Sequence, residues 1–444
     1  MSSTPVSPGE LDEVPDTAAA AGQDLAAREA AFDAFIWSNL RRNYTGNFVH
    51  GMLGMTGFRL INAPTFMPAY LHLVSGSNTI VGLGLALQQV GGVLSPLAAG
   101  THLEHRVRIM PAAVLLGSLG RLAILGMALA GWFLADRVLT ATLLLFLFLF
   151  GVFMGAQRVA FTLLMSKVIP LSLRGRLQAW RNAVGGLIAA VLAYVSGRYL
   201  IGGDVLGNGY AATFILAFIL TSAGLWFLQH QIREPEPPTV RAPARVRDRL
   251  RDVPALIAAD PAYRGFLLVQ MLAASARIAT PFYILYVGAS MHLDGATLGL
   301  LSLAFLGADT VSNIVWGYLG DRSGFRLVLL LAVALWIAST VGLMVLHAPA
   351  TAFLAFFGLG AAQAGYMMAV NTMILEFGHR DDLPMRIGIS ATAEGVTATI
   401  GPLVGGAVAD LLGYGFVFGA SLGLLGAALA LLVLAVRDPR AGAG

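Results

Sequence analysis

The feature that most constrains this chain is a series of apolar runs, each long enough to cross a lipid bilayer. A spanning helix needs about 20 mainly apolar residues, whereas a membrane β-strand needs roughly 10. Because backbone amides find no water to bond to in lipid, runs of this length predict helices. Twelve runs are separated by polar, glycine or proline residues: 45–73, 79–100, 109–133, 139–165, 180–200, 210–229, 264–289, 296–318, 326–347, 350–376, 387–410 and 414–435.

The composition supports the same interpretation. Hydrophobic residues make up 57% of the 444 positions and charged residues only 12%, whereas soluble domains carry about 25% charged residues. A soluble core stops growing near about 250–300 residues. This excludes a soluble enzyme, a nucleic-acid binder and a secreted disulfide scaffold. The sequence has no Cys, so thiolate metal sites are excluded as well.

The basic residues orient the predicted spans. If the N-terminus is cytoplasmic, 22 of the 28 basic residues fall on the cytoplasmic side and only Arg137 and Arg198 fall in outer loops. This bias is a strong positive-inside signal and predicts that both termini are cytoplasmic. The N-terminal residues show no apolar segment typical of a signal peptide. The high Arg content is typical of a GC-rich bacterium, so we expect a protein of the inner membrane in contact with membrane lipid.

A charged stretch between the sixth and seventh spans divides the chain into two halves. Pro64 and Pro281 are 217 positions apart, and the same shift aligns Gly82 with Gly299 and Glu104 with Asp321. Two such six-helix repeats usually hold a substrate site between them that opens alternately to each side. The predicted organisation is a cytoplasmic tail with an interfacial helix (1–43), a first six-helix bundle (44–230), a linker (231–263), a second bundle (264–436) and a short tail (437–444).

One loop carries a family signature. After the eighth span the sequence reads Gly317-Tyr-Leu-Gly-Asp321-Arg322-Ser-Gly324-Phe-Arg326. This resembles the loop motif G-x-L-x-D-R-x-G-x-R of the major facilitator superfamily, at the place of its second copy. A degenerate first copy, Gly100-Thr-His-Leu-Glu104-His-Arg-Val-Arg108, follows the second span. The resemblance implies an all-α integral membrane fold with twelve transmembrane helices in two pseudo-symmetric halves.

The two loop motifs predict a cytoplasmic gate. An acidic side chain beside a helix N-terminus is favoured by the helix dipole. Asp321, and less clearly Glu104, would hold neighbouring helix ends together, and the alternative is ordinary anchoring by basic residues. The gate candidates are Gly317, Asp321, Arg322, Gly324, Arg326, Gly100, Glu104 and Arg108.

Charged residues inside the spans are the candidates for function, because ionisable groups are costly in lipid. Arg59 and Arg277 occupy nearly equivalent positions in the first and seventh spans. By resemblance to the family's organophosphate exchangers they would form an anion clamp, a geometry that suits guanidinium groups. The alternatives are that each Arg caps unwound backbone or pairs with an acidic residue.

Further polar residues extend this candidate site. We expect Arg158, Gln157, Gln363 and Tyr366 to contact substrate, although a gate or intrahelical role for Arg158 is the alternative. Asp309 and Glu394 are the candidates for proton coupling, because an acid in low dielectric can load and release a proton. Each of them could equally serve as the permanent counter-ion of an Arg.

These features predict a secondary active transporter that moves a small polar solute by alternating access. The solute would be anionic if the clamp binds it, and the coupling partner would be a proton or another ion. The alternative is a multidrug or lipophilic-compound efflux pump of the same fold. No nucleotide-binding loop and no cluster of catalytic side chains is found. We therefore expect no enzyme activity, no cofactor, no metal and no nucleic-acid partner, and we expect a monomer.

Overall fold

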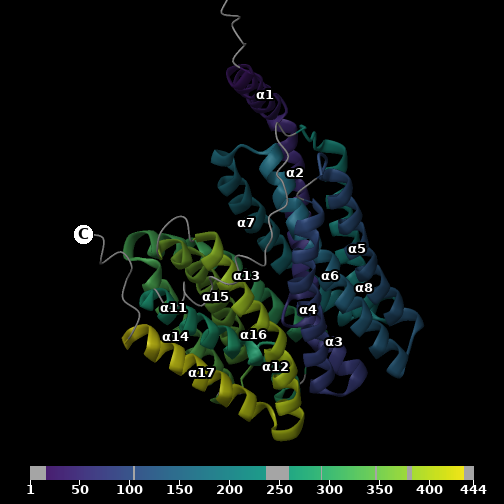
Figure 1. The fold of residues 1–444 in the computed structure, drawn as a ribbon. Helices are drawn as coiled ribbons and strands as arrows, with labels where there is room; N and C mark the ends of the chain where they lie inside the picture. Colours follow the sequence, from purple (N-terminus) through teal and green to yellow (C-terminus); the bar gives the residue numbers. More distant parts are fainter. Residues whose placement is uncertain are drawn as a thin grey trace, which may run out of the picture.

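The computed structural model describes residues 17–103, 106–236, 260–291, 293–345, 348–377 and 383–434. The helices of these residues form two bundles beside each other (Figure 1). The first bundle contains α2 (Leu40–Asn62), α3 (Phe66–Ser75), α4 (Asn78–Leu103), α5 (Met110–Phe133), α6 (Asp136–Val168), α7 (Leu171–Val195) and α8 (Gly209–Gln231). The second contains α11 (Pro261–Ser275), α12 (Phe282–Ser290), α13 (Gly295–Ser323), α14 (Phe325–Val345), α15 (Pro349–Met373), α16 (Leu383–Leu412) and α17 (Tyr414–Leu434).

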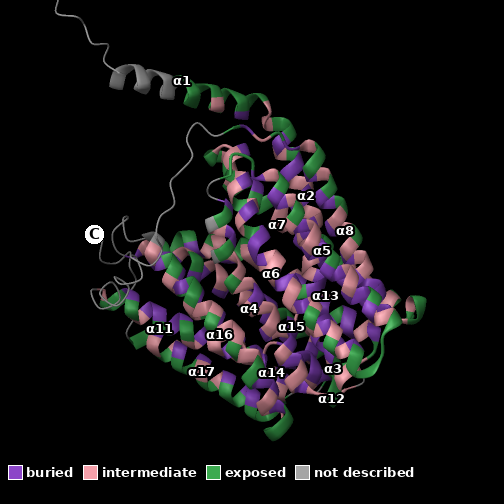
Figure 2. Ribbon diagram, turned by 45° about the vertical axis from the view of Figure 1, so that its right-hand side comes forward, coloured by how far each residue is buried: buried purple, intermediate pink, exposed green. Residues whose placement is uncertain are grey.

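The N-terminal helix α1 (Thr17–Ser38) stands away from both bundles, and its described side chains are mostly exposed (Figure 2). We call the end of the molecule that carries α1 the α1 end, and the opposite end, where α3 and α12 lie, the α3 end. Most of the predicted linker, residues 237–259, lies outside the described residues.

Eleven helical segments in the described parts of the chain are long and apolar enough to cross a membrane. The α2–α3 pair, which is not among them, supplies the twelfth span. Its first half carries Arg41, Arg42, Asn43, Asn47 and His50, and these polar residues lower the mean hydropathy. The expected all-α membrane fold is confirmed, and twelve spans are consistent with it.

The first span of each bundle is broken at the aligned proline. Proline fixes its own φ and has no N–H to donate, so it interrupts a helix. Helix α2 ends at Asn62, and α3 begins at Phe66 just beyond Pro64. In the second bundle, α11 runs into a short 3-10 turn (Ala276–Ala279), and α12 begins just after Pro281. Two matching breaks therefore lie in the interior of the protein.

The exterior of the bundles is suited to lipid. Phe133, Ile314 and Leu434 are 78%, 75% and 84% exposed, respectively. In water such side chains would favour aggregation, whereas lipid tails are as apolar as the side chains themselves. The buried residues instead include many alanines and glycines, which allow helices to approach closely.

The two bundles contact each other through α4 with α16 and through α7 with α13. They converge at the α3 end and diverge toward the α1 end (Figure 1). Close to the first break, the Ser302 hydroxyl donates a 2.7 Å hydrogen bond to the Thr65 hydroxyl. Gly82 of α4 lies against the backbone of Pro402 in α16, and a Cβ atom at Gly82 would overlap the Pro402 carbonyl.

We predict that Gly82→Val separates the bundles at the α3 end, because the added side chain has no space beside Pro402. Since the chain has no native Cys, Leu85→Cys provides a single reporter on α4, three residues after Gly82. A membrane-impermeant maleimide added from the α3 side should label this Cys faster in the Gly82→Val background. The control is Gly419→Val in α17, where the added side chain meets open space. Equal labelling rates in the two backgrounds would contradict the role assigned to Gly82.

Candidate functional site

A central cavity of about 340 Å³ lies where the two broken spans face each other. This volume is in the range of about 300–1,000 Å³ that is usual for small-molecule sites. Both bundles line it, and its lining residues come from α2, α3, α4, α13, α15, α16 and the two breaks. The lining residues are Arg59, Ile61, Asn62, Ala63, Pro64, Pro68, Leu85, Gln88, Gln89, Arg277, Thr280, Pro281, Phe305, Leu306, Asp309, Gln363, Ala398 and Pro402.

Arg59 joins the two bundles. It lies in the last turn of α2, and its Nη1 is 2.8 Å from Asp309 Oδ2 of α13. The same nitrogen donates a hydrogen bond of 2.9 Å to the Thr310 hydroxyl. The Arg59 and Asp309 side chains are 19% and 21% exposed. Because little solvent reaches the two side chains, the attraction between their charges is screened weakly. The pair therefore holds α2 and α13 together across the interface.

Arg277 has its own carboxylate within the second bundle. Its Nη1 donates to Glu394 Oε1 of α16 at 2.9 Å, and both side chains are partly buried. Each cavity arginine therefore has one acidic partner. Glu394 is not itself a lining residue, but its charge offsets that of Arg277, so the two ion pairs together carry no net formal charge.

Uncharged polar groups complete the lining. Gln88 Nε2 donates to Asn62 Oδ1 at 2.6 Å, and Asn62 Nδ2 donates to the Phe58 carbonyl at 2.8 Å. The buried Thr280 hydroxyl has no hydrogen-bond partner among the described residues. Amides and hydroxyls both donate and accept hydrogen bonds, which suits a solute rich in hydroxyl groups.

The other four predicted substrate residues lie in different parts of the protein, and one of them borders the cavity. Gln363 lines the cavity together with Arg59 and Arg277. Gln157 is 2% exposed and faces Gly117 of α5 inside the first bundle. Tyr366 is fully buried in the second bundle, where its hydroxyl donates to the Gln270 carbonyl at 3.2 Å. Arg158 is exposed on α6 and does not border this cavity.

The loop after α13 matches the expected position of the family motif. Gly324 follows α13 with a φ of 85°, in the left-handed region that glycine favours. Arg322 Nη1 donates to the Tyr318 hydroxyl at 3.2 Å, and Arg326 Nη2 donates to the Leu432 carbonyl of α17 at 3.0 Å. Asp321 is exposed, and Gly317 has open space around it. The role of these residues as a gate stays a prediction.

Glu104 lies outside the described residues. Gly100 has open space around it, and Arg108 pairs loosely with Glu236 at 3.5 Å.

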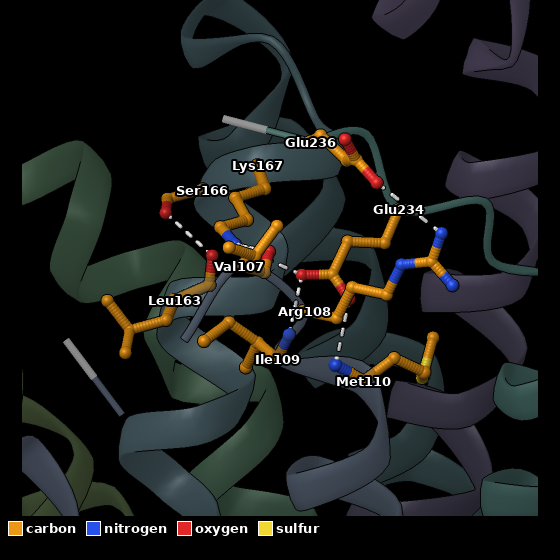
Figure 3. Close-up of polar contacts among 9 residues, drawn as sticks. All are labelled: Val107, Arg108, Ile109, Met110, Leu163, Ser166, Lys167, Glu234 and Glu236. Carbon is orange, nitrogen blue, oxygen red and sulfur yellow. Dashed lines mark hydrogen bonds and ion pairs between the residues drawn. The ribbon is translucent and has the colours of Figure 1, made fainter. Parts of the chain in front are cut away.

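A different acid, Glu234, follows α8 and contacts the start of α5 and Lys167 of α6 (Figure 3). Its two carboxylate oxygens accept hydrogen bonds from the backbone N–H groups of Ile109 and Met110, at 2.7 and 2.9 Å, where α5 begins. Lys167 Nζ lies 3.1 Å from Glu234 Oε1. An acid at a helix N-terminus satisfies free N–H groups and the helix dipole. Glu234 therefore ties the chain after α8 to α5 and α6.

The second bundle has a comparable contact at Asp260. Asp260 Oδ1 accepts hydrogen bonds from the N–H groups of Ala262 and Tyr263 at the start of α11, and Oδ2 accepts one of 2.6 Å from Arg386 Nη1. Burial alone would raise the pKa of Asp260, but these N–H donors and the Arg386 guanidinium lower it below the ordinary value. Arg386 also lies over the Tyr263 ring, 4.7 Å from its centroid.

At the α3 end, Asp410 of α16 caps the start of α4 in the other bundle. Its carboxylate accepts hydrogen bonds from the Asn78 and Thr79 backbone N–H groups, from the Asn78 amide and from the Ser77 hydroxyl, all between 2.8 and 2.9 Å. The Tyr414 hydroxyl donates to Asn78 Oδ1 at 2.8 Å. Helix α4 has no acidic residue in its own first turn, so the second bundle supplies the charge.

The family model described as Major Facilitator Superfamily matches residues 265–444. Two solved transporters share the fold at low identity. The nucleoside transporter NupG superposes with a TM-score of 0.70 at 13% identity, covering 88% of this chain and 99% of its own. A D-xylose-proton symporter superposes with a TM-score of 0.68 at 11% identity, covering 90% of this chain and 99% of its own. The second half of the chain therefore matches the major facilitator superfamily in sequence, and the chain as a whole shares the fold of these transporters.

A curated protein is also similar in sequence. It is Sugar efflux transporter B of Salmonella typhimurium, 24% identical over 226 residues. The match covers 50% of this chain and 53% of that protein, so the chain spans about half the length of the curated relative it matches.

Glu234, Asp260 and Asp410 were not predicted from the sequence as structural contacts. Asp260 had a usable signal, since an Asp directly before a Pro is a typical start of a helix. Asp410 and Glu234 had none, because each caps a helix distant in the sequence.

We predict that Asp410→Asn weakens the cap at the start of α4. The new amide places N–H donors against N–H donors, and hydrogen bonds to a charged group contribute about 1.5–3 kcal/mol. Hydrogen–deuterium exchange at residues 78–82 should accelerate by about 10- to 150-fold, the factor that this energy corresponds to. The control is Asp294→Asn, which removes a carboxylate that caps its own helix α13. Unchanged exchange at the start of α4 in Asp410→Asn would contradict this role.

Proposed function

We propose that this protein is a secondary transporter that moves a small, neutral, hydroxyl-rich solute by alternating access. The observation that carries the proposal is the charge balance of the central cavity, where Arg59 and Arg277 each contact a carboxylate. An anion would have to compete with Asp309 and Glu394 for the two guanidinium groups. A neutral solute can bind the amides and the free Thr280 hydroxyl without breaking either pair. This narrows the sequence-based expectation, which allowed an anionic solute.

The similar proteins support a neutral solute only as analogy. Sugar efflux transporter B, NupG and the D-xylose-proton symporter are named for sugars or nucleosides. We propose the same broad class for this chain, with Arg59, Arg277 and Gln363 in contact with the solute.

We further propose that the Arg59–Asp309 pair links proton movement to the conformational change. This pair joins the two bundles, so its strength depends on how they are placed relative to each other. Protonation of Asp309 would remove the charge that holds Arg59. The Arg277–Glu394 pair lies within one bundle and has no such dependence. We therefore propose that Asp309 binds the transported proton. Glu394 would help to position the solute.

We also propose that the protein works as a monomer in the bacterial inner membrane, with both termini in the cytoplasm. The distribution of basic residues supports this orientation. In this arrangement the α1 end is cytoplasmic. Because the bundles diverge there and converge at the α3 end (Figure 1), the structure corresponds to an inward-facing state.

The solute class can be tested by thermal stabilisation of the purified protein, because a ligand that binds the folded state raises its apparent stability. The probes are separate pools of pentoses and hexoses, of nucleosides, of sugar phosphates and of dicarboxylates. We expect one of the neutral pools to stabilise the protein. Arg59→Gln should fold but lose this shift, whereas Arg137→Gln, in an outer loop, should keep it. Stabilisation by the anionic pools alone would contradict a neutral solute.

Proton coupling is tested with Asp309→Asn in proteoliposomes, using the compound found in the stabilisation screen. We expect exchange of labelled for unlabelled solute to continue, while accumulation driven by a pH gradient falls at least about tenfold, a change that corresponds to roughly 1.4 kcal/mol. The matched variant Glu394→Gln should weaken solute binding but keep the response to the gradient. If Asp309→Asn accumulates solute as the wild type does, Asp309 is not the coupling group.

A further inference from the structure

A second concave surface lies on the outside of the first bundle, away from the central cavity. It is a groove of about 570 Å³ between the first turns of α2 and α7. These helices pack along each other, and both begin at the α1 end (Figure 1). Tyr44, Phe48 and Leu173 form its apolar wall. Arg41 and Arg176 also line it.

The two groove arginines differ from their neighbours. Arg42 donates to the His230 and Gln231 carbonyls at 2.7 and 2.8 Å, and Arg174 donates to the Ser166 and Ile169 carbonyls at 2.6 and 2.8 Å. Arg41 and Arg176 are exposed, and neither makes a hydrogen bond or ion pair with another described residue. Arg42 and Arg174 therefore hold backbone carbonyls in place. Arg41 and Arg176 instead face the groove.

The remaining lining indicates the depth of the groove in the membrane. Trp180 borders it with 53% of its surface exposed, and Tyr44 lies nearby. Tryptophan and tyrosine are enriched at the level of lipid headgroups because they combine an apolar ring with a polar group. The groove therefore presents positive charge and aromatic rings at headgroup depth, together with an apolar wall.

We propose that this groove binds one anionic glycerophospholipid from the leaflet on the α1 side. The phosphate would lie between the Arg41 and Arg176 guanidinium groups, which match its geometry with paired N–H donors. One acyl chain would follow the apolar wall formed by Phe48 and Leu173. None of the lining residues is acidic, so the ammonium group of a zwitterionic lipid would find no partner. The charge of the groove thus selects an anionic headgroup.

Trp180 supplies a reporter for this lipid. The full-length protein is placed in nanodiscs of phosphatidylcholine that contain increasing fractions of acyl-brominated phosphatidylglycerol, or of acyl-brominated phosphatidylcholine at the same fractions. Bromine quenches tryptophan fluorescence at short range. Comparison with Trp180→Phe isolates the contribution of Trp180 from the other five tryptophans. We expect the phosphatidylglycerol to quench Trp180 at about tenfold lower mole fraction, because each basic side chain near the surface favours an anionic lipid.

The variants separate a site from general surface charge. The double variant Arg41→Gln/Arg176→Gln should lose the headgroup preference and keep the weaker quenching by phosphatidylcholine, which also shows that it is folded. The control Arg264→Gln removes an exposed charge that lies outside this groove, at the start of the second bundle, and should keep the preference. Equal quenching by the two brominated lipids in the wild type would overturn the proposal, and so would a preference that survives in the double variant.

A competition experiment distinguishes binding of a lipid from binding of a soluble phosphate. Glycerol phosphate, which has the headgroup phosphate but no acyl chain, is added at millimolar concentration. We expect quenching by brominated phosphatidylglycerol to remain, because the apolar wall contributes to binding. Loss of quenching would show a site for soluble phosphate and would overturn the assignment to a lipid.

Discussion

The pairing of charges inside the membrane is the constraint on which the rest of this structure depends. An unpaired ionisable group is costly in lipid, and the chain places two arginines and two acids near the centre of its bundles. Arg59 with Asp309 and Arg277 with Glu394 resolve this cost with two short contacts. Arg121, which is 2% exposed, instead donates to the Thr221 and Gly117 carbonyls and lies near the Phe58 ring. The two paired sites leave the cavity polar but neutral, and one of them crosses between the bundles.

The other polar contacts divide into those within a bundle and those between bundles. Glu234 with Lys167 and Asp260 with Arg386 each hold helix ends of a single bundle together. Asp410, Ser302 and Arg59 contact the opposite bundle. Rigid bundles that share a limited set of breakable contacts are suited to rocking about a central site. The breaks at Pro64 and Pro281 place that site, because each break brings an arginine to the centre.

Much of the fold could be predicted from the sequence, because the length of an apolar run directly determines a membrane helix. The first span was predicted from its apolar run, 45–73, because the polar residues of α2 lie mainly before this run or in its first turns. Arg59, Arg277 and Gln363, which were expected to contact substrate, line one cavity, and their contact with substrate stays a prediction. Gln157 and Tyr366 were placed less well, because spanning helices are apolar on all sides and the sequence gives little information on which side faces inward. The pairing of Arg59 with Asp309 joins residues 250 positions apart, so no local pattern could show it.

The central claim is that Arg59 and Asp309 act as one neutral pair across the two bundles. A double-mutant cycle of Arg59→Gln and Asp309→Asn, read as the free energy of unfolding in mixed micelles, tests it most directly. We predict that each single variant is destabilised because the remaining charge is unpaired. The double variant should lose less free energy of unfolding than the two single variants lose in sum. The difference, which is the coupling energy, should be about 1–3 kcal/mol. Additive effects would show that the two side chains are independent and would contradict this account.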